Sequence, residues 1–167
     1  MEKERPSVII ELDPILQDYL YHEFGKTTDE GVYINCKHDI GLFIQAMITL
    51  SDRPPKQELK DYPIRIYLPV QEWNHHILRE NFIYVPVWKQ DLIRKYVEAS
   101  FRLKQREYFV TGYEKGFGQD MIVKSFLDTY NIKHNQCNYD AVKKYDYRNR
   151  KRTIKEVRQA IQLSIFD

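Results

Sequence analysis

The spacing of apolar residues changes near residue 87, and this change limits the fold more than any other feature of the chain. Before that point, short apolar runs typical of strands alternate with stretches of helical spacing. Strands are predicted over 8–12, 32–36, 62–68 and 82–85, and helices after Pro14, around 40–48 and over 71–79. Pro54 and Pro55 are expected to end the second helix, because proline cannot continue the hydrogen-bond ladder.

From residue 87 on, the apolar residues recur at helical spacing. The pattern predicts a helix from about Val87 to Phe109 and a loop over 111–118. A short helix follows and stops at Asn131, since asparagine tolerates the left-handed conformation of a helix end. Asn138 is expected to cap a further helix that runs to Arg152.

The fold class expected from these patterns is α+β. The N-terminal half would hold a small mixed sheet with helices, and the C-terminal half would be helical and resemble a helix-turn-helix. Thr153-Ile-Lys-Glu156 has the capping-box pattern, which predicts that a new helix starts there. Three parts are therefore expected: an acidic α/β subdomain over 1–86, a basic helical DNA-binding subdomain over 87–153, and a C-terminal helix with a tail over 154–167.

Length and composition indicate a globular cytoplasmic protein. The chain has 167 residues, of which 43% are hydrophobic, and no apolar run approaches the length needed to span a bilayer. Residues 1–6 lack the apolar segment of a secretion signal. Cys36 and Cys137 do not make a disulfide framework. No membrane contact is predicted.

The net charge of +2 hides an uneven distribution along the chain. Residues 1–88 hold 9 Lys and Arg against 14 Asp and Glu, whereas residues 89–167 hold 17 against 10. Within 143–158 there are eight basic and two acidic side chains. Charge asymmetry of this kind predicts that only the second half meets a polyanion.

Two short helices joined by a tight turn, with a basic second helix, predict a helix-turn-helix that binds duplex DNA. Lysine and arginine neutralise phosphates, while arginine and asparagine can read base edges in the major groove. The predicted DNA-binding residues are Lys143, Lys144, Tyr147, Arg148, Asn149, Arg150, Lys151, Arg152 and Lys155. The alternative is a solvated basic helix surface. Residues 126–132 with 139–152 also resemble helix-turn-helix regions in small proteins of phages and mobile elements.

The last six residues, Gln-Leu-Ser-Ile-Phe-Asp, resemble the bacterial sliding-clamp-binding peptide, whose pattern is Gln, aliphatic, Ser or Asp, aliphatic, Phe. The resemblance implies that the glutamine amide anchors the peptide and that the apolar side chains fill a pocket on the replication clamp. The implied clamp-binding residues are Gln162, Leu163, Ser164, Ile165 and Phe166. The alternative is a last helical turn that packs into the core.

Motifs for catalysis are weak. Gly112-x-x-x-Gly116-x-Gly118 lacks the Lys-Ser/Thr of a phosphate-binding loop. His76-Ile-Leu-Arg79 matches a recombinase fragment and Glu58-Leu-Lys60 a nuclease fragment, and neither has a supporting context. No paired carboxylates stand out for metal-dependent cleavage. The sequence predicts a protein that is not an enzyme.

Two cysteines and two histidines form a weak zinc candidate. Cys36 with His38 and His134 with Cys137 supply a ligand set that zinc accepts. The Cys-x-His spacing is not that of a zinc finger, and these residues are expected to be strand-end and loop polar residues. No cofactor and no bound metal are predicted.

These features together predict a DNA-binding accessory protein of a phage or mobile element that docks on the replication sliding clamp. Each contact raises the local concentration of the other. The acidic N-terminal half would then form a homodimer or bind another partner. The alternatives are a helix-turn-helix regulator of transcription or excision without clamp binding, and a small nuclease or recombinase.

Overall fold

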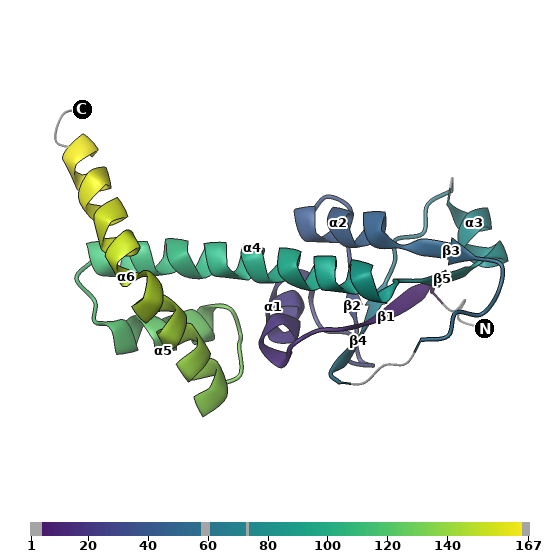
Figure 1. Cartoon of the computed structure of the whole chain (residues 1–167), viewed down its shortest axis with the longest axis horizontal. Coiled ribbons are helices and arrows are strands. Elements are labelled where there is room, and N and C mark those ends of the chain that lie inside the picture. Colours follow the sequence, from purple (N-terminus) through teal and green to yellow (C-terminus); the bar gives the residue numbers. More distant parts are fainter. Residues whose placement is uncertain (1–4, 58–60, 73, 165–167) are drawn as a thin grey trace. The chain divides into compact units, whose positions relative to one another are not determined.

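The computed structural model of the chain is shown in Figure 1 and describes residues 5–57, 61–72 and 74–164. Its class is α+β, as predicted from the sequence. The chain divides into two compact units, Met1–Glu98 and Ala99–Asp167. This division falls within helix α4 (Val87–Glu114), so that one helix contributes residues to both units.

The first unit is built on a three-stranded mixed sheet. Its strands are β1 (Ser7–Glu11), β4 (Pro63–Tyr67) and β2 (Val32–Tyr33), in the order β1-β4-β2. β1 is antiparallel to β4, and β2 is parallel to β4. Val8 and Ile66, which are partners in the β1–β4 register, are both buried, because alternate residues of each strand face the core.

Local signals set the ends of the first helix as predicted. Helix α1 (Pro14–Phe24) follows Asp13 as N-cap residue, with proline in the first turn. It ends at Gly25, whose φ of 81° favours glycine and whose N–H donates to the Tyr21 carbonyl. Leu16, Tyr19 and Leu20 form the buried face of α1.

The end of the second helix differs from the prediction. Helix α2 (Asp39–Met47) stops well before the two prolines, because Ile48 is already extended. The next residues form strand β3 (Thr49–Ser51), which pairs antiparallel with β5 (Phe82–Tyr84) in a second, two-stranded sheet. The sequence does not predict β3, since its pairing partner lies about 33 residues further along the chain. Helix α3 (His75–Glu80) precedes β5.

The second unit contains the rest of α4 and two further helices. Helix α5 (Gln119–Thr129) ends near Asn131, whose φ of 52° is the left-handed conformation that the sequence predicts there. The Ile132 N–H donates to the Leu127 carbonyl at 2.9 Å, and the Ile132 side chain is buried against the turn. Helix α4 runs five residues beyond the predicted end at Phe109.

Helix α6 (Gln136–Ser164) is continuous, so the new helix predicted at Thr153 is not present. Thr153 is only 2% exposed, and its hydroxyl donates to the Asn149 carbonyl one turn earlier. Burial of Thr153 within the second unit therefore outweighs the capping-box pattern. The start of α6 also differs: the Asn135 Oδ1 accepts from the Asn138 N–H at 2.7 Å, so Asn135 caps the helix.

An aromatic core holds the second unit together. Phe101 and Phe109 of α4 surround Phe126 of α5, with ring centroids 5.6 and 6.4 Å from that of Phe126. Gly112 lets α4 and α5 approach closely, because a Cβ there would lie 2.7 Å from two carbon atoms of Ile122. The core therefore fixes α5 on the C-terminal part of α4.

Candidate nucleic-acid interface

One face of helix α6 carries five exposed cations, which we call the basic stripe. They are Lys144, Arg148, Lys151, Lys155 and Arg158. Their spacing of four, three, four and three residues confines them to an arc of about 80° on a helix that turns about 100° per residue. The stripe is about 21 Å long at a rise of about 1.5 Å per residue. Among the described residues, none is an ion-pair partner of these five.

The opposite face of α6 is buried. Val142, Asp146 and Thr153 lie about half a turn away from the stripe and have exposed fractions of 0%, 3% and 2%. The basic stripe therefore points away from the core of the second unit, with its charged ends in water.

The predicted DNA-binding residues divide into two groups. Lys144, Arg148, Lys151 and Lys155 belong to the basic stripe, and Tyr147 is exposed beside it. The others make contacts within the protein. Arg158 lies at the end of the basic segment 143–158 but is not among the predicted DNA-binding residues. The alternating spacing of four and three residues, continued from Lys155, identifies it.

Three predicted cations form ion pairs. Lys143 Nζ lies 2.8 Å from the Asp120 carboxylate, Arg152 Nε lies 3.4 Å from Glu156, and Arg150 faces Asp146. The hydrogen bond from Lys143 is the main cause that lowers the pKa of Asp120. Asn149 also turns inward, since its side-chain amide donates to the Tyr145 carbonyl. Of these contacts, the Lys143–Asp120 pair joins α6 to α5, and the others lie within α6.

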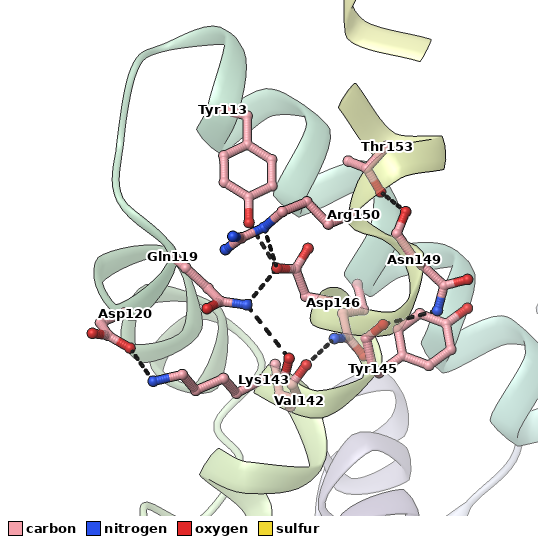
Figure 2. A network of polar contacts seen from close by, with 11 residues as sticks. Tyr113, Gln119, Asp120, Val142, Lys143, Tyr145, Asp146, Asn149, Arg150 and Thr153 are labelled. Atoms are coloured by element: carbon pink, nitrogen blue, oxygen red, sulfur yellow. Dashed lines mark hydrogen bonds and ion pairs between the residues drawn. The ribbon is translucent and has the colours of Figure 1, made fainter. Parts of the chain in front are cut away.

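A polar network around Asp146 fastens the middle of α6 to the neighbouring helices. Figure 2 shows side chains from three helices converging on one carboxylate: the Tyr113 hydroxyl donates to Asp146 Oδ2 at 2.7 Å and the Gln119 amide donates to the same oxygen at 2.6 Å. Arg150 Nε lies 3.9 Å away on the same side. Burial, and secondly the bond to Asp146, raise the pKa of Tyr113 to about 12, so the phenol is a donor at neutral pH.

Helix α4 supplies a second set of anchors. Figure 1 shows α6 crossing the C-terminal part of α4, where the buried Gln105 amide donates to the Val142 carbonyl at 2.8 Å. The Arg102 guanidinium lies 4.4 Å from the centroid of the Tyr145 ring. Arg106 pairs with Glu156. The basic stripe is thus displayed on a helix that is fixed by buried polar contacts.

The structure does not show a helix-turn-helix of the predicted form. The connection between α5 and α6 comprises residues 130–135, longer than the tight turn of that motif, and α6 is 29 residues long. Two of the residues expected to read base edges, Asn149 and Arg150, face the protein instead, because Asn149 donates to the Tyr145 carbonyl and Arg150 faces Asp146.

The clamp-like tail falls at the edge of the described residues. Gln162, Leu163 and Ser164 belong to the last turn of α6, and the Gln162 side chain is exposed. Ile165 and Phe166 lie outside the described residues. The described part of the chain therefore shows no extended clamp-binding peptide, and docking on a clamp remains a prediction from the sequence.

The candidate zinc ligands have other partners. Cys36 Sγ donates to Gln45 at 2.6 Å, while His38 Nε2 contacts Glu23 at 2.9 Å. His134 contacts Asp128 at 2.7 Å. Within residues 5–57, 61–72 and 74–164, no three His, Cys, Asp or Glu side chains gather in a way that would hold a metal ion.

No protein-family model, curated protein or solved structure matches this chain. Among the helices of the described residues, none combines the length and apolar character needed to cross a membrane.

Proposed function

We propose that this chain is a DNA-binding protein that holds the phosphate backbone of duplex DNA with the basic stripe of α6. The observation that carries the proposal is the set of five cations without a partner among the described residues, on one exposed arc. Contact with a polyanion releases the counterions condensed on it, which favours binding in proportion to the number of phosphates neutralised.

Ordinary solvated helices usually mix charges, and α6 does so outside the stripe. Lys143 and Arg152 have acidic partners, whereas adjacent stripe residues such as Arg148 and Lys151 face only like charges at helical spacing. Such like-charge neighbours destabilise a helix. A bound polyanion would remove this repulsion, which favours the DNA-binding interpretation over the solvated surface.

The chemistry of the stripe favours backbone binding without strong sequence preference. Lysine supplies three of its five cations and acts as a point charge, while only Arg148 and Arg158 offer the planar fork that matches a guanine edge. Affinities of non-specific DNA binding are of the order of 10⁻⁴ to 10⁻⁶ M at physiological salt. We expect this chain to fall in that range.

A matched pair of variants tests the proposal. Lys151→Gln with Lys155→Gln removes two charges from the stripe, and Lys115→Gln with Lys124→Gln removes two exposed lysines elsewhere in the second unit. Fluorescence anisotropy with a labelled duplex should show affinity about tenfold or more lower for the stripe variant at about 0.1 M salt. The control variant should bind like the wild type. Equal losses in both variants would show that only net charge matters and would overturn the proposal.

A further inference from the structure

The first unit contains a pocket of about 590 Å³ at one edge of its three-stranded sheet. Tyr33 and Ile34 line it at the carboxyl end of β2, and Leu68 lines it just after the end of the parallel strand β4. Helix α3 contributes His75, Leu78 and Arg79. The pocket therefore lies at the carboxyl ends of the two parallel strands, β2 and β4.

The pocket is basic although the unit around it is acidic. Arg5 and Arg79 line it, and no Asp or Glu is among its described lining residues. The Arg5 guanidinium lies 4.7 Å from the centroid of the Tyr33 ring, which holds it at the pocket wall. Neither arginine forms an ion pair with a described residue. Two guanidinium groups without such a partner in one pocket favour a ligand with two negative charges.

The remaining wall is mainly apolar. Ile34 and Leu68 are buried residues of the sheet edge, Leu78 is half-buried, and Pro6 and Pro69 add carbon surface. Backbone contact closes this wall, since the Leu68 N–H donates to the Pro6 carbonyl at 2.9 Å. A pocket of this size with apolar walls and a few charged groups is typical of small-molecule sites.

We propose that this pocket binds a small organic phosphate of about the size of a nucleoside monophosphate. The phosphate would accept hydrogen bonds from Arg5 and Arg79, which match its geometry. The planar ring of the ligand would lie against Ile34, Leu68 and Leu78. This site is separate from the basic stripe, so its existence does not depend on DNA binding.

Isothermal titration of the full chain with adenosine monophosphate tests the proposal. Arg5→Gln and Arg79→Gln should each weaken binding about tenfold, because each removes charge-assisted hydrogen bonds to the phosphate. Arg53→Gln removes an exposed arginine of the same unit outside the pocket and should bind like the wild type. Ribose 5-phosphate keeps the phosphate and the sugar but lacks the planar base, and it should bind at least about tenfold more weakly.

Four results with the pocket variants and ligands would overturn the proposal, and a fifth comes from the basic stripe. They are no binding of adenosine monophosphate by the wild type, unchanged binding after both pocket substitutions, an equal loss for Arg53→Gln, and equal affinity for ribose 5-phosphate. The variant Lys151→Gln with Lys155→Gln serves as a further control. A loss of nucleotide binding in that variant would assign the phosphate to the basic stripe and would also contradict the pocket.

Discussion

Removal of the Asp146 carboxylate should strongly destabilise the second unit. The Asp146 side chain is 2% exposed, accepts hydrogen bonds from Tyr113 and Gln119, and faces Arg150. Asp146→Ala would leave the Tyr113 hydroxyl and the Gln119 amide without their shared acceptor. Arg150 Nε, which is buried with no hydrogen-bond partner among the described residues, would also lose the nearby carboxylate. The Arg150 side chain is 40% exposed, so water compensates its charge. We therefore expect a cost of about 3 kcal/mol, from about 1–3 kcal/mol for each hydrogen-bond donor that loses the carboxylate.

Two variants separate the charge effect from the hydrogen bonds. Tyr113→Phe removes one donor to Asp146 and should cost about 1 kcal/mol. Asp146→Ala combined with Arg150→Ala removes both charges, and its cost should be smaller than the sum of the single costs by about 1 kcal/mol or more. Additive costs would show that the two charges do not interact.

Urea unfolding followed by two signals measures these effects. Both tryptophans, Trp73 and Trp88, belong to the first unit, so their fluorescence reports on that unit, whereas circular dichroism at 222 nm reports on all helices. Asp146→Ala should move the circular dichroism transition to lower urea and leave the fluorescence transition in place if the units unfold separately. A loss of stability no greater than that of Tyr113→Phe would refute the assigned role of Asp146.

Three further predictions concern the second unit and the tail. The pKa of Tyr113 is raised from 10.0 to about 12, so its contribution to stability should be complete below pH 10 and lost as the pH rises toward 12. Urea unfolding across that range should show a larger loss for the wild type than for Tyr113→Phe, in which other groups with a raised pKa, such as Tyr139 and Lys143, still titrate. Gly112→Ala should cost about 1–3 kcal/mol in thermal unfolding, since the new Cβ would meet Ile122, and an unchanged midpoint would contradict the close packing of α4 and α5. Deletion of residues 162–167 should abolish capture by a bacterial sliding clamp in a pull-down and leave DNA affinity nearly unchanged. Failure of the full-length chain to bind the clamp would contradict that interpretation.

Much of the fold follows from local signals in the sequence. Asp13 with Pro14, Gly25 and Asn131 mark helix ends that the structure confirms, because these residue types act through their own backbone conformations. The predictions are wrong where residues far apart in the sequence determine the local structure. Thr153 has a capping-box sequence but is buried inside α6, and β3 exists because residues about 33 positions away pair with it.

The candidate interface is predictable only in part. The excess of cations in 143–158 is visible in the sequence, and the four-three spacing of the basic stripe is visible too. The sequence does not show which of these cations are free of an acidic partner, because some partners come from other helices. Lys143 is paired with an aspartate 23 residues earlier, and Arg106 brings Glu156 against α4 across 50 residues. Such pairings cannot be read from local composition.

The salt dependence of DNA binding tests the basic stripe most directly. If the five cations neutralise five phosphates, the logarithm of the association constant for duplex DNA should fall against the logarithm of salt concentration with a slope of about −4.5, at about 0.9 per phosphate. Replacing Lys151 and Lys155 by glutamine should reduce the slope by about 1.8, and replacing Lys115 and Lys124 should leave it unchanged. A slope near zero, or the same slope for the stripe variant as for the wild type, would contradict the proposed interface.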